Sequence, residues 1–338
     1  MLAKTLISLV TASSVAVSSA VAGPALLFDP VNGHVLYAED QDNQWHPASL
    51  TKIMTAYLVF EALREGKLTL RQKIPCSKFA HSQAPSRLGI AVGTEITVEL
   101  ALHALIVKSA NDAAIMLAEA IAGSHEAFVA RMNAAAARLG MSRTRFANAN
   151  GLPAPEQVTT ARDLARLTAA VLRDFPDQAH LWSMEDMRIG KRRLRSHNSL
   201  LRSYDGADGI KTGFICDSGF NVVASATRDG RRLVAVVLGE VTGRERGARA
   251  ANLLEHGFQT YGWQVLFGTD TLTTMPIAED AKGVQSIRNS VKVRACGYRP
   301  KGAVAKRAKR KKARAAAKRK SGKTASKQSG KVSVKAKD

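Results

Sequence analysis

The chain has 338 residues, of which 45% are hydrophobic, so it can bury one large core or two modest ones. Its formal net charge of +22 is unevenly distributed: residues 301–338 hold sixteen Lys or Arg against one Asp, a balance of +15 that leaves +7 elsewhere. The eight His and three Cys show no metal-ligand spacing, so neither a metal site nor a disulfide framework is expected. At most one pair can form among Cys76, Cys216 and Cys296, and the sequence does not say which.

The first 22 residues have the three parts of a secretory signal peptide. Lys4 supplies a positive start, residues 6–17 are mostly apolar, and Ala20-Val21-Ala22 is an A-x-A cleavage pattern. The apolar stretch is too short and too rich in serine for a membrane-spanning helix. We therefore expect an exported protein, cleaved after Ala22 and located in the periplasm or cell envelope.

Two strands and a helix are predicted next. Residues 25–28 and 34–38 are apolar runs joined around Asn32-Gly33, which is typical of a β-hairpin turn. Helical periodicity follows from Ser49 to about Arg64 and ends near Gly66.

The middle of the chain is predicted to be helical. One helix is expected over about residues 111–121, and a second begins at a Ser124 cap and ends at Gly140. A third opens on a Thr160-x-x-Asp163 capping box and ends before Pro176.

Strands return towards the end of the folded region. A strand is predicted for residues 209–214, followed by a hairpin over 220–239 that turns at Asp229-Gly230, and then by a helix over about 246–259. Strands at both ends with helices between them predict an α/β (α+β) fold. Its sheet is mainly antiparallel and built from both ends of the domain, with helices on its faces.

These elements place the folded domain at residues 23–268. Residues 269–300 show short Thr/Val/Ile patterns without strong periodicity, and we expect a linker or small appendage there. Residues 301–338 contain no aromatic, Leu, Ile or Met residue. They cannot bury enough apolar surface to fold and are predicted to be a disordered basic tail.

Three short motifs could supply a catalytic site. Ser49-x-x-Lys52 occurs once, and residues at i and i+3 of a helix are neighbours, so a neutral lysine there could take the serine proton. Taken alone, the pattern is more typical of a capping serine and an exposed lysine.

The second motif is Ser109-Ala110-Asn111, where a hydroxyl and an amide two residues apart in a tight turn can point into one cleft. Ser196-His197-Asn198 has the same S-x-N form, but it opens no strong helix and lies only fifteen residues before the third motif, so we set it aside.

The third motif is Lys211-Thr212-Gly213, which occurs once and lies on a predicted strand. A twisted edge strand can bring a lysine, a hydroxyl and bare backbone against a ligand.

In this order the three motifs resemble those of penicillin-binding proteins and class A β-lactamases. The resemblance extends over about residues 24–267, through "PASLTKIMTAYLVFEAL", "LIVKSANDAAIMLAE", "FANANGL", "HNSLL", "DGIKTGF" and "RRLVAVVLG". The chain is most similar to the serine D-alanyl-D-alanine carboxypeptidases, the low-molecular-mass penicillin-binding proteins. That resemblance implies a β-lactamase/transpeptidase-like fold with no cofactor.

The resemblance also implies roles. Ser49 would attack the carbonyl of the terminal D-Ala-D-Ala bond in a peptidoglycan stem peptide, and Lys52 would accept its proton. Ser109 and Lys211 would relay a proton to the departing D-alanine, and Asn111 would hydrogen-bond the substrate. Water would release the acyl-enzyme, and β-lactam antibiotics would act as covalent inhibitors.

Backbone N–H groups of Ser49 and Phe214 would form the oxyanion hole. Thr212 could donate to the free carboxylate of the substrate. The family also uses an arginine after the last hairpin, which matches Arg246 better than Arg244, although both stay open.

The sequence departs from the family pattern in two respects. Ile215 stands where the family usually has threonine, and neither a β-rich second domain nor an amphipathic C-terminal helix is expected.

Two other enzyme activities are possible for these motifs. A D,D-endopeptidase would use the same motifs. A β-lactamase is disfavoured, because the only glutamates between Gly151 and Lys211 are Glu156 and Glu185, and neither lies in the required pattern.

The tail suggests electrostatic contact with anionic envelope surfaces. No specific nucleic acid partner is expected, because binding through the tail would leave the three motifs unexplained.

Overall fold

The computed structural model describes residues 23–267 and 270–298. The chain divides into one unit that ends at Val291 and a second that begins at Lys292. In the second unit the described part contains the 3-10 turn η4 (Arg294–Cys296). The expected signal peptide of residues 1–22 and the basic tail of residues 301–338 lie outside the described residues.

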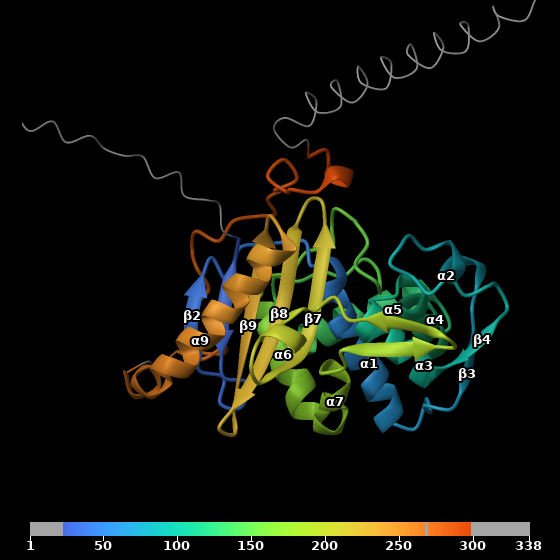
Figure 1. Cartoon of the computed structure of the whole chain (residues 1–338), viewed down its shortest axis with the longest axis horizontal. Coiled ribbons are helices and arrows are strands. Elements are labelled where there is room, and N and C mark those ends of the chain that lie inside the picture. Colours follow the sequence, from blue (N-terminus) through green and yellow to red (C-terminus); the bar gives the residue numbers. More distant parts are fainter. Residues whose placement is uncertain (1–22, 268–269, 299–338) are drawn as a thin grey trace, which may run out of the picture. The chain divides into compact units, whose positions relative to one another are not determined.

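A five-stranded antiparallel sheet forms the frame of the first unit, in the order β2-β1-β9-β8-β7 (Figure 1). Its strands are β1 (Ala25–Phe28), β2 (Val35–Glu39), β7 (Ala207–Ile215), β8 (Gly219–Arg228) and β9 (Arg231–Glu240). Because β1 pairs with β9, the sheet joins the two ends of the domain, as the order of elements predicted.

The β8–β9 hairpin turns where the sequence indicated. Asp229 and Gly230 both have positive φ, 49° and 74°, the left-handed geometry that suits the twist of a two-residue hairpin. This hairpin supplies the two longest strands and most of the apolar surface at the centre of the sheet.

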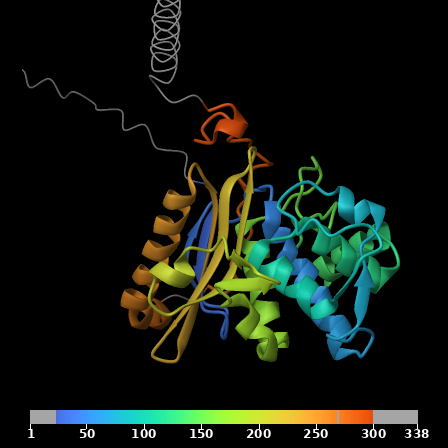
Figure 2. The same ribbon diagram turned by 45° about the vertical axis from the view of Figure 1, so that its right-hand side comes forward.

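Helices cover both faces of the sheet (Figure 2). On one face α9 (Gly243–Phe267) packs against β8, β9 and β2. The buried side chains of this layer include Leu27, Val222, Ala224, Leu233, Ala235 and Val237 from the sheet and Leu254 from α9. On the other face α6 (Ala161–Asp174) packs against β9 and β1. Covering both faces explains why β8 and β9 are almost continuously apolar.

The predicted helices are present, with corrected boundaries. The element expected from Ser49 begins as a 3-10 turn, η1 (Ala48–Thr51), and continues as α1 (Lys52–Arg64). The last helix is longer than the predicted 246–259, because α9 extends by several residues at each end. Of the middle helices, α4 spans Asn111–Ala122 and α5 spans His125–Arg138.

Two predicted caps are confirmed. The Ser124 hydroxyl accepts from the Ala127 N–H, and the Thr160 hydroxyl accepts from the Asp163 N–H at 3.0 Å. The capping box at Thr160 is only half formed, because the Asp163 carboxylate accepts instead from the N–H of Arg143 and the hydroxyl of Thr144.

Several short elements were not predicted. They are β3 (Lys73–Pro75), α2 (Lys78–Ser82), β4 (Glu95–Thr97), α3 (Val98–His103), the π-helical η2 (Ala104–Lys108), η3 (Pro176–Gln178), α7 (Ala179–Trp182), β5 (Asp186–Ile189), β6 (Arg192–Arg195) and α8 (Leu200–Ser203). Segments of three to six residues are too short to show a period, so their sequence carries no signal.

The first unit continues past the domain end expected at residue 268. Residues 270–291 lie along its surface as a strap, which bridges His34 through Thr271 and buries Leu272 and Val291. The segment expected to be a linker or small appendage is therefore packed against the rest of the first unit up to Val291.

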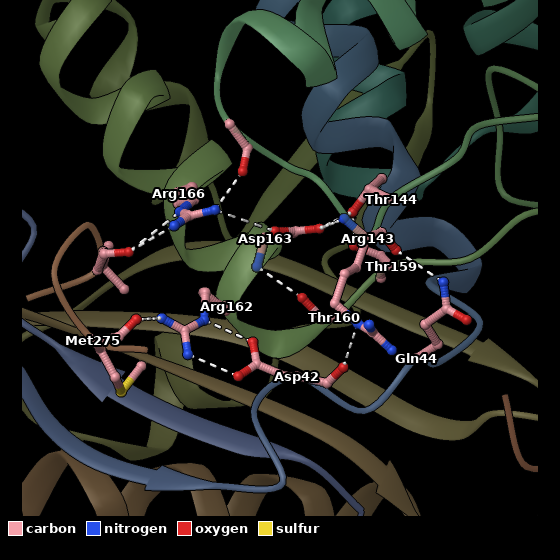
Figure 3. Close-up of polar contacts among 12 residues, drawn as sticks. Asp42, Gln44, Arg143, Thr144, Thr159, Thr160, Arg162, Asp163, Arg166 and Met275 are labelled. Carbon is pink, nitrogen blue, oxygen red and sulfur yellow. Dashed lines mark hydrogen bonds and ion pairs between the residues drawn. The ribbon is translucent and has the colours of Figure 1, made fainter. Parts of the chain in front are cut away.

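A buried ion pair holds this strap in place (Figure 3). The Arg162 guanidinium donates to both carboxylate oxygens of Asp42, at 2.6 and 2.7 Å, and to the carbonyls of Met275 and Pro276 in the strap. Asp42 and Arg162 are each 1% exposed. Burial raises the pKa of the Asp42 carboxyl, but the hydrogen bonds and charge of Arg162 outweigh it and lower that pKa overall.

The three cysteines are in two different states. Cys76 is a buried free thiol, whereas Cys216 and Cys296 are both disulfide-bonded.

Within residues 23–267 and 270–298 no single helix is long and apolar enough to cross a membrane, although α4 and α5, which meet at 85°, reach that length and composition together.

Candidate active site

Ser49 lies in the turn η1 (Ala48–Thr51), which we call the serine turn. Two glycines, one on β7 and one in a loop, allow neighbouring backbone to approach this turn closely. A Cβ on Gly213 would meet the Pro47 carbonyl oxygen at 2.8 Å and the Ser49 nitrogen at 3.1 Å. A Cβ on Gly151, whose φ is +83°, would meet the Ala48 carbonyl oxygen at 1.9 Å. A side chain at Gly213 would separate residues 47–50 from β7, and a side chain at Gly151 would separate residues 48–49 from the loop after Asn150.

The amine of Lys52 joins three separate segments. Its Nζ donates to Ser49 Oγ at 2.9 Å, to Asn111 Oδ1 at 2.7 Å and to the Asn150 carbonyl. Lys52 is only 1% exposed, and no ion pair of this lysine occurs within the described residues. The predicted contact of serine with lysine is present, and it is made inside the protein rather than on an exposed helix face.

Burial changes the acid–base behaviour of this amine. Desolvation first, and then the positive charge of Lys211, lower the pKa of Lys52 well below its ordinary value, while the charge of Asp112 opposes them. A neutral amine at hydrogen-bond distance from a hydroxyl can accept its proton.

A second lysine–serine pair lies beside the first. Lys211 Nζ donates to Ser109 Oγ at 2.9 Å, across 102 residues of sequence, and to the Thr212 carbonyl at 3.2 Å. Ser109 has a left-handed backbone, with φ 58° and ψ 39°, because it links η2 to α4. Desolvation and the nearby Arg246 lower the pKa of Lys211 to about 7.

Both pairs open onto one pocket of about 430 Å³. It is lined by Ser49, Pro85, Ser86, Ser109, Asn111, Gly151, Leu152, His197, Thr212, Gly213, Phe214, Ile215, Phe220, Gly243 and Arg246. Every predicted site residue is in this list except Lys52 and Lys211, whose amines reach the two lining serines from behind. Among the described residues, neither Glu156 nor Glu185 lines the pocket.

Arg246 lines the pocket, and the alternative Arg244 does not. Arg246 is 8% exposed, its Nη2 donates to the His197 carbonyl at 3.3 Å, and its Nε has no hydrogen-bond partner among the described residues. Burial lowers the pKa of Arg246 to about 10, which still leaves it charged near neutral pH. A buried cation with an unused donor indicates an anion-binding position.

An aromatic pair forms part of the pocket wall. The ring of Phe214 lies 4.3 Å from that of Phe220, and Phe214 remains 36% exposed. Ile215, which departs from the family pattern, also lines the pocket.

Two residues of the site were missed by the sequence analysis. Asn150 contributes its carbonyl to Lys52, and its amide donates to Gln83 at 2.8 Å. His197, in the S-x-N sequence that we set aside, lines the pocket, while Asn198 is buried and donates to the Gly209 carbonyl. Asn150 lies in the stretch "FANANGL" and His197 in "HNSLL", and both stretches belong to the family resemblance, so they could have indicated these residues.

The known proteins that this chain resembles belong to one peptidase family. The family model for D-alanyl-D-alanine carboxypeptidases, peptidase family S11, matches residues 10–242. D-alanyl-D-alanine carboxypeptidase DacC of Escherichia coli is 38% identical over 243 residues, which is 70% of this chain and 61% of that protein. The chain thus spans less than two thirds of the length of the curated relatives it matches.

Solved structures share the fold. Penicillin-binding protein 5 of Haemophilus influenzae superposes with a TM-score of 0.68 at 34% identity, covering 70% of this chain and 71% of that one. Penicillin-binding protein D2 of Listeria monocytogenes, solved with cefotaxime bound, has a TM-score of 0.64 at 33% identity and covers 70% and 97%. The β-lactamase/transpeptidase-like fold is therefore confirmed.

The low pKa of Lys211 predicts how stability depends on pH. Its amine titrates near pH 7 in the folded chain and near pH 10.4 when unfolded, so between these values the unfolded state holds one more proton. The free energy of unfolding should therefore rise with pH across this window. We expect Lys211→Met to reduce that slope by roughly 1.4 kcal/mol per pH unit, as measured by urea unfolding at pH 7.5 to 9.5.

The exposed Lys73 offers a matched control, and Lys73→Met should keep the slope of the unaltered protein. Equal slopes for the unaltered protein and Lys211→Met would show that Lys211 stays charged in the folded state.

Proposed function

Because the chain belongs to the D-alanyl-D-alanine carboxypeptidase family, we propose that it removes the terminal D-alanine from peptidoglycan stem pentapeptides through an acyl-enzyme. One observation carries the proposal: two lysine–serine pairs meet at a pocket that ends at a buried arginine with an unused donor. The pairs supply a nucleophile and proton carriers, and the arginine supplies a partner for a free carboxylate.

Acylation begins at Ser49. The neutral Lys52 amine takes the hydroxyl proton as the oxygen attacks the carbonyl of the terminal peptide bond. Asn111 accepts from Lys52 and donates to the Ala84 carbonyl, so it holds the amine in place, and a hydrogen bond from Asn111 to the substrate remains a prediction of the family resemblance.

Two backbone groups receive the developing negative charge. The N–H groups of Ser49 and Phe214 would form an oxyanion hole, and the close approach of Gly213 to the Ser49 nitrogen supports this role.

The second pair serves the leaving group. Ser109 can give its proton to the departing D-alanine nitrogen and recover one from Lys211, with which it shares a hydrogen bond. Because the pKa of Lys211 is about 7, this lysine can both hold and release a proton near neutral pH. Water then attacks the acyl carbonyl and frees Ser49.

The terminal carboxylate would bind at Arg246, with the Thr212 hydroxyl as a second donor. A D,D-endopeptidase would use the same groups to cleave within cross-links. The matching family and relatives, which are named as carboxypeptidases, favour the carboxypeptidase reading. A β-lactamase is less well supported still, because the described residues that line the pocket include no carboxylate to activate the deacylating water.

β-Lactam antibiotics would acylate the same serine. A relative from Listeria monocytogenes has been solved with cefotaxime bound, which supports this proposal for the present chain.

The role of Ser49 can be tested by labelling with a fluorescent penicillin. The unaltered chain should be labelled covalently, and Ser49→Ala should abolish labelling, because no other hydroxyl of the pocket lies against Lys52. Ser183→Ala, an exposed serine outside the pocket, should label normally. Stoichiometric labelling of folded Ser49→Ala would refute the assignment.

The role of Arg246 can be tested with paired substrates. Arg246→Ala should lower kcat/KM for a D-Ala-D-Ala peptide by about 100-fold, the loss expected for a buried charge-assisted hydrogen bond. The same variant should act almost normally on the C-terminal amide of that peptide. Arg244→Ala is the matched control, because Arg244 is exposed and outside the pocket. Equal losses on both substrates would make Arg246 a structural residue only.

We also propose that the protein is exported and acts in the periplasm or cell envelope, where the basic tail attracts it to anionic surfaces. The signal-peptide pattern of residues 1–22 and the +15 balance of residues 301–338 support this. The tail has cations but no large apolar side chains, so its attraction would be electrostatic.

A chain ending at Pro300 tests the tail. Full-length protein should bind vesicles of acidic phospholipid or isolated sacculi at low salt and lose that binding steeply as salt rises. The shortened chain should bind weakly at any salt and hydrolyse small peptides normally. Equal binding by both chains, or binding that salt does not change, would rule the tether out.

A further inference from the structure

The β5–β6 hairpin carries a dense positive charge. Residues 185–195 contain five Lys or Arg against two carboxylates, and the exposed cations are Arg188, Lys191, Arg192, Arg193 and Arg195. We refer to residues 186–195 as the basic hairpin.

The strand register places three of these five cations on one face of the hairpin. Arg188 lies directly opposite Arg193, and Asp186 lies opposite Arg195, so these four side chains share one face of the hairpin. Asp186 forms an ion pair with Arg193, whereas Arg188 and Arg195 form none within the described residues. Like charges in directly opposite positions repel, so this face keeps a positive potential that an anion would relieve.

The other face of the hairpin is anchored in the protein. Met187 is buried and its partner Leu194 is half-buried, and both strands pack against η2, the helical turn that leads to Ser109. The hairpin therefore rests on the segment that positions a serine of the site, next to β7 in the view of Figure 1.

The hairpin also leads directly into the pocket wall. Arg195 is two residues before His197, which lines the pocket, so their Cα atoms lie within about 7 Å of each other. Inside the pocket the cation is Arg246, which hydrogen-bonds the His197 carbonyl. His197 thus connects the two cations, since Arg246 hydrogen-bonds its carbonyl and Arg195 lies two residues before it in the chain.

We propose that the basic hairpin is an exosite for the glycan-linked polymer that carries the scissile peptide, which it binds through carboxylates of neighbouring stem peptides. This inference rests on the proposed function, because it names the form of the substrate that the same site receives. A single peptide in the pocket would present its carboxylate to Arg246, while adjacent stems on the strand would reach Arg188 and Arg195. Planar guanidinium groups suit bidentate contact with carboxylates.

Carboxylates of a polymer explain this surface better than lipid headgroups do, because the hairpin leads into the wall of the pocket that would receive a stem peptide. A surface that inserts into a bilayer also needs exposed apolar side chains beside its cations. None of the exposed large hydrophobic residues of the described chain belongs to the basic hairpin.

Binding and turnover test the exosite separately. In the Ser49→Ala chain, compared with and without residues 301–338 so that the tail is accounted for, Arg188→Gln with Arg195→Gln should weaken binding of soluble, uncross-linked pentapeptide glycan strands about fivefold at low salt, as expected for two exposed charge pairs. In the active chain the same change should lower kcat/KM for D-alanine release from these strands by a similar factor. Hydrolysis of a short peptide whose only carboxylate is terminal should not change.

Arg71→Gln with Lys73→Gln is the matched control, since it removes two exposed cations elsewhere and should alter neither measurement. A similar loss in the control, an equal loss on the short peptide, or unchanged strand binding would overturn the exosite. If the hairpin variant loses binding to phosphatidylglycerol vesicles but keeps strand binding, the surface recognises lipid and the proposal is wrong. Absence of D-alanine release from any peptide by the unaltered chain would contradict the proposed function alone, because strand binding is measured without turnover.

Discussion

The structure depends on keeping the Lys52 amine buried without a carboxylate in contact with it. Three oxygen acceptors replace such a partner, and they come from the serine turn, from α4 and from the loop at Asn150. A neutral amine can donate to the Asn111 and Asn150 oxygens and accept from the Ser49 hydroxyl, whereas none of the three oxygens compensates a full positive charge as a carboxylate would. Burial and the nearby Lys211 therefore lower the pKa of Lys52, as its proposed role as a base towards Ser49 requires.

Close backbone packing keeps these segments together. Gly213 lets β7 approach the serine turn, and Gly151 lets the loop after Asn150 approach the same turn from another direction. The chain just before the serine turn is also hydrogen-bonded to the sheet, because Asn221 of β8 donates to the His46 carbonyl at 3.0 Å. In the same segment, Trp45 forms two backbone hydrogen bonds with Thr159 in the loop that precedes α6.

The strap adds a further restraint, because the buried Asp42–Arg162 pair fixes residues just upstream of the turn. Breaking a buried pair of this kind costs about 3–5 kcal/mol, so the strap is an integral part of the unit.

The pocket and its surroundings share one electrostatic character. Lys52, Lys211 and Arg246 lie within or behind the pocket, and each has its pKa lowered by burial first. Such a concentration of amines and guanidinium groups is costly without an anion, which is consistent with a substrate that carries carboxylates. The same excess of positive charge extends to the basic hairpin, where the side chains are exposed and interactions with anions are weaker and more sensitive to salt.

The sequence by itself determined the family resemblance, the antiparallel sheet built from both ends of the domain, and the identity of nearly every catalytic candidate. These features are local: Ser49 and Lys52 are one turn apart, and K-T-G lies within a single strand. Tertiary structure alone decided which distant groups meet. It joined Lys211 to Ser109 across 102 residues, supplied the Asn150 carbonyl, selected Arg246 over Arg244 and brought His197 into the pocket from a stretch that local reasoning had set aside. It also packed residues 270–291 onto the domain, because their anchor is a buried guanidinium more than 100 residues away rather than any period of their own. Local sequence encodes propensity and short-range geometry, whereas these contacts depend on how separate segments pack, and that is set only when the whole core forms.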